Sequence, residues 1–196
     1  MNKTDDLILK TADSHGGYIT LSECEALGIH KNSVFNLKKK NLLVRQASGI
    51  YTLPQAIPDE LFILYLRFPS LVFSHETALY YLGYSDQVPF KYTVTVPNNF
   101  HSSALADYTV VQQKADFINE GKIEIETEYK NKIPVYCIER TLCDLLHKPS
   151  SLDLERFVPA LKKYLHSKER SNIKLLDFAK KIGVEKKIRT YMEVAL

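Results

Sequence analysis

Residues 20–54 read TLSECEALGIHKNSVFNLKKKNLLVRQASGIYTLP, and this stretch decides the fold of the N-terminal part of the chain. Thr20 and Glu23 have the spacing of a capping box, in which each side chain binds the backbone N–H of the other at a helix start. Gly28 is placed to end that short helix, because glycine adopts the left-handed conformation of a helix C-terminus without strain. Cys24 provides the small side chain that two closely crossing helices require. The pattern predicts a helix, a tight turn and a second helix.

The helix after the turn is predicted over about residues 30–40, with Val34 and Leu37 on its inward face. Two short apolar runs follow it and are joined by a turn at Ser48-Gly49, which predicts a β-hairpin. Another helix is predicted upstream, over residues 4–14. Three short helices and a hairpin in this order predict a winged helix-turn-helix domain over residues 1–56.

The charges of this domain indicate a nucleic-acid partner. From Lys31 to Ala56 the chain has five basic residues and no acidic residue. The third helix of such a domain enters the major groove, where Asn and Lys read base edges and Lys and Arg bind phosphates. The predicted DNA contacts are Lys31, Asn32, Ser33, Asn36, Lys38, Lys39 and Lys40 on the helix, and Arg45 and Ser48 on the hairpin. The alternative is a winged helix used only for protein contacts, which would not need an acid-free basic stretch.

Length and composition exclude several classes of protein. The chain has 196 residues, of which 45% are hydrophobic and 25% charged, with a net charge of +3. These are the values of one large or two small globular domains. No apolar run approaches the roughly 18 residues of a membrane-spanning helix, and the polar start at residues 1–6 is not that of a signal peptide. With only three cysteines, a cytoplasmic protein with reduced thiols and no membrane contact is expected.

Residues 57–196 are predicted to form a larger α+β domain behind a linker at residues 54–58. Alternating, β-branched runs predict strands at residues 91–96, 108–112, 122–128 and 133–138. Helices are predicted at residues 59–67, at residues 74–82 with Ser74 as N-cap, and from residue 139 onward. The strand at 122–128 alternates isoleucines with acids, so its isoleucines are expected to face inward. The expected architecture is a small, mainly antiparallel sheet with a helical C-terminal bundle.

The C-terminal third is basic, because residues 141–196 carry twelve basic and seven acidic side chains. Such a face can bind nucleic acid, or it can simply solvate surface helices. The residues that would form an antitoxin or nucleic-acid face are Lys162, Lys163, Lys168, Arg170, Lys180, Lys181, Lys186 and Lys187.

Two pairs of residues have the spacing of enzyme or metal sites, but neither predicts one. Cys143 and His147 share a helix face as zinc ligands do, yet no second pair with matching spacing completes the site. His75 and Glu76 are adjacent on a predicted helix, so their side chains are expected to point apart. Helix capping and packing explain His75 and Glu76 better than catalysis does.

The best enzymatic alternative is a metal-dependent nuclease. Glu128 and Lys130 form a Glu-x-Lys at a strand end, and Asp107 precedes another strand. In such nucleases carboxylates hold the cation and a lysine positions the water. The acids of this strand fit a solvated face equally well, and the chain has no phosphate-binding glycine loop. We therefore expect no catalytic residue, no metal and no cofactor.

Four stretches, spread over nearly the whole chain, resemble the AbiEi antitoxins of bacterial toxin–antitoxin systems. They are SGIYTLP at residues 48–54, VFSHETAL at 72–79, YTVTVP at 92–97 and VYCIERTLCDLL at 135–146. The second resembles the central Ser-His-Glu-Thr-Ala-Leu helix start of the family, and the fourth its Glu-Arg-Thr-Leu-x-Asp-Leu signature. The order and spacing of the four make the resemblance specific.

The resemblance implies an antitoxin of a type IV system acting in abortive phage infection. Its winged helix would bind repeats in the promoter and repress the shared operon. Its larger domain would counter a nucleotidyltransferase-like toxin, without need of a stable complex. The toxin's own pattern, a Gly-Ser followed by paired aspartates, is absent from this chain.

The resemblance also implies DNA contacts at Lys31, Asn32, Ser33, Asn36, Lys39 and Arg45. The chain departs from the family at its third helix, where lysine and asparagine replace the usual arginine. This departure affects which bases would be contacted, but not the groove that would be used. The alternative function is a ligand-responsive winged-helix regulator without a toxin partner.

Overall fold

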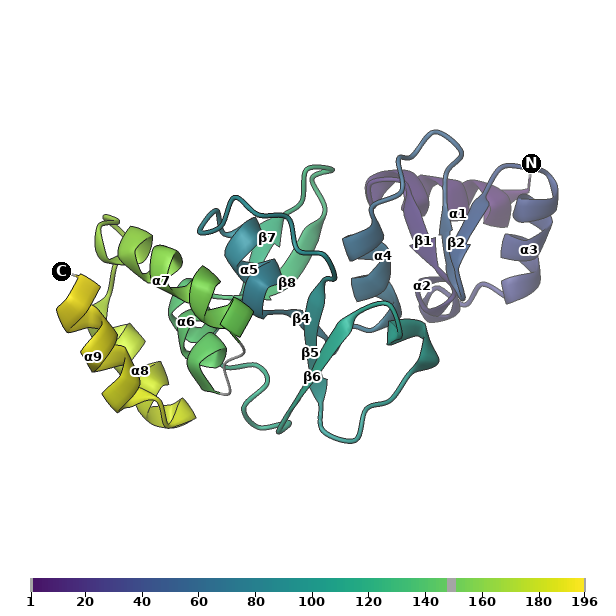
Figure 1. Cartoon of the computed structure of the whole chain (residues 1–196). Helices are drawn as coiled ribbons and strands as arrows, with labels where there is room; N and C mark the ends of the chain where they lie inside the picture. Colours follow the sequence, from purple (N-terminus) through teal and green to yellow (C-terminus); the bar gives the residue numbers. More distant parts are fainter. Residues whose placement is uncertain (1, 148–150, 196) are drawn as a thin grey trace. The chain divides into compact units, whose positions relative to one another are not determined.

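The computed structural model describes residues 2–147 and 151–195 and consists of two compact units (Figure 1). The first unit comprises Met1–Pro69 with Glu126–Lys132, and the second comprises Ser70–Ile125 with Ile133–Leu196. The expected domain boundary after residue 56 therefore falls inside the first unit. Residues 148–150, within the predicted C-terminal helical region, lie outside the described part of the chain.

The first unit is a winged helix-turn-helix, as the sequence predicts. Its helices are α1 (Lys3–Ser14), α2 (Leu21–Ala26) and α3 (Lys31–Lys39). Its strands are β1 (Tyr18–Thr20), β2 (Val44–Ala47) and β3 (Ile50–Thr52), in the order β1-β3-β2 with both pairs antiparallel. The three-residue strand β1, which completes the sheet, has no signal in the local sequence.

Local sequence explains how the helices of this unit begin and pack. The capping box is present, because Thr20 N donates to Glu23 Oε2 at 2.7 Å and Glu23 N donates to Thr20 Oγ1 at 3.1 Å. Gly28 has φ +70°, the left-handed conformation expected after α2. The side chains of Cys24, Val34 and Leu37 are fully buried in one apolar core. This core fixes which side of α3 faces solvent.

Helix α4 (Glu60–Arg67) completes the first unit and begins at a buried carboxylate. Asp59 is its N-cap, and Asp59 Oδ1 accepts a hydrogen bond from Phe62 N at 3.1 Å. Thr127 and Asn131, from the tip of a distant hairpin, donate to the other oxygen of Asp59 at 2.5 and 2.9 Å. These bonds explain why Glu126–Lys132 belongs to the first unit.

The sheet of the second unit has five strands in the order β6-β5-β4-β8-β7. The strands are β4 (Val72–Phe73), β5 (Thr93–Pro97), β6 (Thr109–Gln113), β7 (Lys122–Glu126) and β8 (Lys132–Tyr136). The pair β4–β5 is antiparallel, whereas β5–β6 and β4–β8 are parallel. The α+β class is confirmed, but the sheet is mixed rather than mainly antiparallel, because crossover connections bring chain segments back in the same direction.

Strand β7 lies at an edge of this sheet, which changes the environment of its isoleucines. Ile123 is 37% exposed although it alternates with acids as predicted. An edge strand is covered less completely than a central one, so alternation alone overstates burial.

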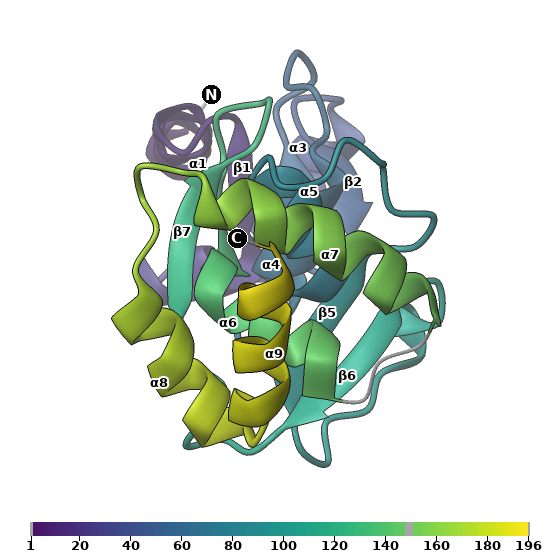
Figure 2. The same cartoon turned by 60° about the vertical axis from the view of Figure 1, so that its left-hand side comes forward.

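The helices of the second unit pack around α6. They are α5 (His75–Tyr81), α6 (Ile138–His147), α7 (Ser151–Leu165), α8 (Asn172–Ile182) and α9 (Glu185–Ala195), with a 3-10 turn at Ser103–Leu105. Figure 2 shows α7, α8 and α9 around α6, and Leu142, Phe157 and Leu175 are fully buried in this core. Among the described residues, no helix is both long and apolar enough to cross a membrane.

Candidate nucleic-acid interface and a second cavity

Helix α3 presents one polar face to solvent, opposite to its two core residues. At 3.6 residues per turn, Asn32, Asn36 and Lys39 lie on the side away from Val34 and Leu37. All three polar side chains are exposed. The helix carries no acidic residue, and Lys38 and Lys39 lie in its last turn. This face can therefore approach a phosphate-lined surface without electrostatic repulsion.

A groove of about 570 Å³ runs between α3 and the strands of the wing. Its lining residues are Asn32, Phe35, Asn36, Lys38, Lys39, Arg45 and Tyr51. The groove thus combines side-chain amides, an aromatic ring and three cations on one surface of the first unit. Amides and apolar groups suit base edges, whereas the cations suit phosphates.

The structure brings together five of the nine DNA contacts predicted for this domain. These five are Asn32, Asn36, Lys38, Lys39 and Arg45, which all line the groove. Arg45 is oriented along the hairpin because its Nε donates to Ala47 O at 3.2 Å.

The other four predicted contacts lie outside the groove. Lys31 is exposed at the start of α3, Ser48 is exposed in the wing turn, and Ser33 is half-buried on the flank of the helix. Lys40 Nζ lies 3.4 Å from Asp5 Oδ2, so this lysine is directed toward α1. This ion pair explains why Lys40 does not line the groove.

Two aromatic residues of this site, Phe35 and Tyr51, were not predicted from the sequence. Phe35 is 36% exposed and lies between the two asparagines along the same helix face. A helical projection would have found it, because a Phe three residues after Asn32 cannot share the face of Val34 and Leu37. Tyr51 also lines the groove although it is 97% buried, and its strand pattern carries no such signal.

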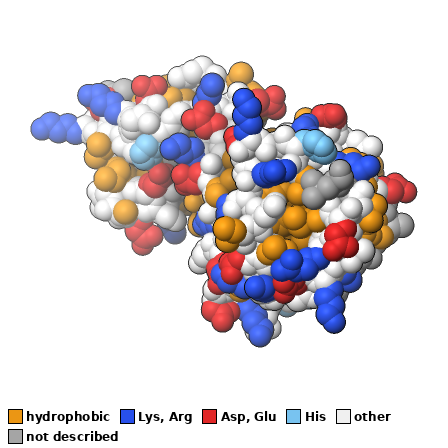
Figure 3. Space-filling model, turned by 90° about the vertical axis from the view of Figure 1, so that its left-hand side faces the viewer, with side chains coloured by type: hydrophobic (Ala, Val, Ile, Leu, Met, Phe, Trp, Pro, Cys, Tyr) orange, Lys and Arg blue, Asp and Glu red, His pale blue; other side chains and the backbone are white. Residues whose placement is uncertain are grey.

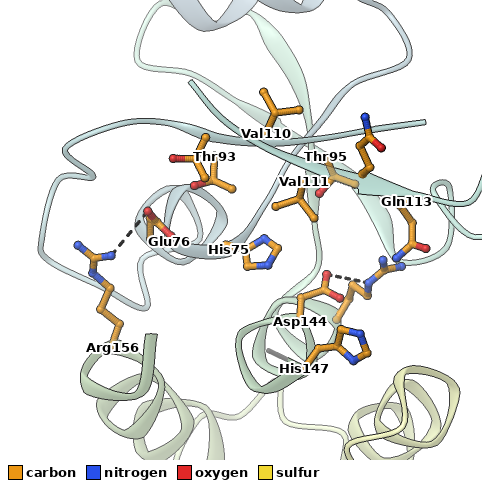
Figure 4. A pocket seen from close by; sticks show the side chains of 13 residues that line it. His75, Glu76, Thr93, Thr95, Val110, Val111, Gln113, Asp144, His147 and Arg156 are labelled. Atoms are coloured by element: carbon orange, nitrogen blue, oxygen red, sulfur yellow. Dashed lines mark hydrogen bonds and ion pairs between the residues drawn. The ribbon is translucent and has the colours of Figure 1, made fainter. Parts of the chain in front are cut away.

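The second unit contains a cavity of about 590 Å³ between the sheet and helices α5, α6 and α7 (Figure 4). Its lining residues are His75, Glu76, Thr93, Thr95, Thr109, Val110, Val111, Gln112, Gln113, Arg140, Asp144, His147 and Arg156. His75 and Glu76 were expected to point apart, yet both line this cavity. Six of the thirteen lining residues come from the stretches at 72–79, 92–97 and 135–146.

Two ion pairs flank this cavity, so its formal charges are balanced pairwise. Arg140 Nε donates to Asp144 Oδ2 at 2.8 Å, and Arg156 lies 3.6 Å from Glu76. The guanidinium of Arg140 is buried and stacks on the rings of Phe117 and Tyr136, at 4.2 Å from each centroid. Burial raises the pKa of Asp144, although Arg140 beside it acts in the opposite direction.

Ser74 is the N-cap residue of α5, as predicted, but its side chain has a different role. Its side chain makes no capping bond to α5. Instead Ser74 Oγ accepts a hydrogen bond from Thr95 Oγ1 at 2.9 Å and lies 3.1 Å from His75 Nδ1. The hydroxyl of Thr95 binds the oxygen that a side-chain cap would use. The contact between Ser74 Oγ and His75 Nδ1 holds the imidazole of His75 in the cavity (Figure 4).

Two further features distinguish the cavity from ordinary packing. His75 has φ +50°, a left-handed conformation that is uncommon outside glycine. Within the described part of the chain, the buried Thr93 Oγ1 has no hydrogen-bond partner, although Thr93 lines the cavity. Strained backbone and unpaired buried hydroxyls are more frequent at ligand sites than elsewhere.

The cysteine and histidine considered as metal ligands have different partners in the structure. Cys143 Sγ is buried 3.6 Å from Leu175 O, whereas His147 Nδ1 lies 3.1 Å from Ile182 O. Asp107 and Glu128 belong to different compact units. Among the residues the structure covers, no group of three His, Cys, Asp or Glu side chains could hold a metal ion.

The basic residues of the C-terminal helices are distributed over three helices and their connections. Figure 3 shows Lys and Arg side chains on the helical side of the second unit, interspersed with acids around an apolar area. Lys181 Nζ is paired with Glu120 at 2.8 Å and Asp177 at 3.2 Å. Arg170 and Lys187 donate to backbone carbonyls of Leu165 and Leu146. Lys162, Lys163, Lys168, Lys180 and Lys186 are exposed.

Comparison with known proteins finds a matching family model and solved structures of similar fold. Residues 6–54 match the model of a family described as a transcriptional regulator, AbiEi antitoxin. The fold is similar to the crystal structure of the RV2827C protein from Mycobacterium tuberculosis, with a TM-score of 0.51 and 14% identity over 98% of this chain and 82% of that one. At this identity the likeness concerns the fold alone. No curated protein matches the chain.

Proposed function

We propose that the chain is an antitoxin that represses its own operon, because its residues 6–54 match the model of the AbiEi antitoxin family of transcriptional regulators. The first unit would bind repeats in the promoter, and the second would counter a nucleotidyltransferase-like toxin encoded beside it. The toxin need not form a stable complex, as in type IV systems of abortive phage infection. This role belongs to the cytoplasm, where promoter DNA lies, and requires no catalytic residue, metal or cofactor.

The observation that carries the DNA-binding part is the acid-free groove of the first unit. Asn32 and Asn36 project from the exposed face of α3, and Lys38, Lys39 and Arg45 surround them. In winged helix-turn-helix proteins a helix of this kind enters the major groove while the wing contacts the backbone. The lysines and the arginine would then bind phosphates on either side of the base contacts.

The test is binding of the full chain to the DNA upstream of its own gene, measured by fluorescence anisotropy. We expect Lys39→Ala combined with Arg45→Ala to weaken binding about tenfold or more at moderate salt, because two phosphate contacts are lost. Lys10→Ala is the matched control, since Lys10 is an exposed lysine of the same unit on α1. Equal affinities of the double variant and the wild type would contradict this interface.

The antitoxin part is supported by the exposed cations of the second unit. We infer that they bind an RNA or nucleotide that the toxin uses, which would neutralise the toxin without a tight complex. Co-expression with the neighbouring gene product should show rescue of growth by the wild type. Charge reversal at Lys162, Lys163 and Lys180 should abolish rescue, whereas Lys181→Glu tests a lysine already paired with acids. Unchanged rescue by the triple variant would overturn this mechanism.

A ligand-responsive regulator is the second candidate function, and the cavity of the second unit favours it. The cavity offers the unpaired hydroxyl of Thr93 and the imidazole of His75 beside two apolar residues of β6, Val110 and Val111. Its volume of about 590 Å³ is typical of small-molecule sites, and its mainly polar and charged lining suits a polar compound. Thermal-shift screening of metabolites against the wild type and Thr93→Val tests it. A compound that stabilises only the wild type would support ligand sensing.

A further inference from the structure

The exposed side chains of α3 favour one kind of base pair in the operator. Resting on the DNA binding proposed above, we propose that α3 reads A·T base pairs. Asn32 and Asn36 would each bind an adenine, and Phe35 would contact the methyl group of a thymine. The proposal concerns base preference, which the family match leaves open.

The spacing of these three residues suits neighbouring base pairs. Asn32 and Asn36 are four residues apart on one helix face, which places them about 6 Å apart along the helix axis. Successive base pairs are separated by about 3.4 Å, so the two amides can reach bases roughly two steps apart. Phe35 lies between them along the axis and lines the same groove. One helix can thus touch a short, continuous run of bases.

The chemistry of the amide selects adenine. Asparagine can donate to adenine N7 and accept from adenine N6 at once, because adenine presents an acceptor beside a donor in the major groove. Guanine presents two acceptors there, so the amide oxygen would meet O6 without a proton between them. In the described part of the chain, neither amide side chain is engaged in an internal hydrogen bond, and both are exposed. Both are therefore free to bind bases.

The chemistry of Phe35 selects thymine at the neighbouring position. Its ring is 36% exposed on an otherwise polar face, where it has no partner in the core of the unit. In the major groove, thymine alone of the four bases presents a methyl group, and phenylalanine is among the side chains that contact it. An apolar ring in this place would be unfavourable against the donor of cytosine.

Few residues that read G·C pairs are placed for it on this face. Helix α3 contains no arginine, aspartate or glutamate, so lysine is its only side chain that commonly reads guanine. Lys31, at the start of α3, does not line the groove. The wing arginine Arg45 is oriented along the hairpin by its bond to Ala47 O. Lys39 lies in the last turn of α3, whereas base contacts come from the N-terminal part of a recognition helix.

The experiment is selection of binding sites from a random duplex library by the purified full chain. We expect selected sites to share adenines about two base pairs apart, flanked by thymine. Changing either adenine to guanine should weaken binding about tenfold. Replacement of each adenine by 7-deazaadenine, which lacks the N7 acceptor, and of thymine by uracil, which lacks the methyl, should also weaken binding by the unmodified protein. These base analogues test the contacts without a protein variant.

Protein variants then assign each contact. Asn36→Ala should remove the preference for adenine at one position and leave the other, and Phe35→Ala should make thymine and uracil equivalent. Gln55→Ala, an exposed amide of the same unit outside α3, is the control and should change neither. Binding without A·T preference, or selection of G·C at these positions, would overturn this inference and leave the proposed DNA binding intact. Failure of the wild type to bind any duplex would overturn the proposed DNA binding itself.

Discussion

Thr127 Oγ1 donates a 2.5 Å hydrogen bond to Asp59 Oδ2, which joins residues 68 positions apart in the sequence. Asn131 Nδ2 donates to the same oxygen at 2.9 Å, and Tyr18 Oη accepts from Asp59 N at 2.8 Å. The carboxylate is therefore a buried acceptor at the centre of a polar cluster. Because of this cluster, the first unit is not a continuous piece of chain, and its contents extend beyond the winged helix itself.

The first prediction concerns this carboxylate. Asp59→Ala leaves the buried hydroxyl of Thr127 and the half-buried amide of Asn131 without their acceptor, and it removes the cap of α4. We expect the free energy of unfolding to fall by about 2–4 kcal/mol, from unpaired buried groups and a lost cap. Urea denaturation measures this loss. Asp13→Ala, at an exposed position of α1, is the control and should change stability by less than about 0.5 kcal/mol.

Much of the winged helix could be predicted because its signals are local. The bonds between Thr20 and Glu23 form within one turn of helix, so their residue types and spacing were sufficient. The strand β1 could not be predicted, since its three residues carry no alternation and it exists through pairing with β3. Likewise, nothing in the sequence of residues 126–132 indicates that Thr127 and Asn131 bind Asp59.

The candidate sites were predicted only in part, because some of their residues are placed by local sequence and others by distant partners. Asn32 and Asn36 could be placed from the position of the two core residues of α3. The position of Lys40 depends on Asp5, which lies 35 residues away, and local sequence does not contain that information. Ser74 is the N-cap residue of α5 as predicted, but its side chain makes no capping bond because Thr95, on a strand, binds the same oxygen. The parallel strand pairs also depend on distant partners.

The second prediction contrasts two neighbouring lysines in their dependence on salt. Lys39 lines the groove, whereas Lys40 is directed toward Asp5. If Lys39 binds a phosphate, Lys39→Ala should reduce the slope of log affinity against log salt by about 1. Lys40→Ala should leave the slope unchanged and lower stability by no more than about 1 kcal/mol, as for a surface ion pair. Titrations at several salt concentrations measure both, and equal slopes for the two variants would argue against this geometry.

The third prediction concerns stability at alkaline pH. Burial raises the pKa of Tyr136 far above its ordinary value of 10.0. The folded state therefore keeps the phenol proton that the unfolded chain releases above pH 10. The stabilisation is fully present below pH 10 and is lost as the pH rises beyond it, by about 1.4 kcal/mol at pH 11 for one tyrosine.

Tyr136→Phe separates this effect from the general loss of stability in base. It removes the 2.9 Å hydrogen bond to Ile118 O, so we expect the variant to be less stable at pH 8 by about 1 kcal/mol. Between pH 8 and pH 11, however, its stability should fall less steeply than that of the wild type. Urea denaturation at the two pH values gives the comparison, and parallel declines would show that Tyr136 does not titrate on unfolding.

The last prediction uses two glycines that share a conformation but not an environment. Gly121 and Gly183 have φ values of +73° and +81°, so alanine is strained at both positions. A Cβ at Gly121 would lie 2.9 Å from the ring of Phe178 and 3.0 Å from the Cβ of Arg140, whereas nothing lies within 4 Å at Gly183. Gly183→Ala should therefore lower stability by about 1 kcal/mol, from backbone strain alone. Gly121→Ala should lower it by about 3 kcal/mol or more, because it also displaces the buried Arg140, whose guanidinium binds Asp144. Thermal denaturation of the two variants tests this difference, and similar melting temperatures would mean that the contact around Arg140 is looser than the structure shows.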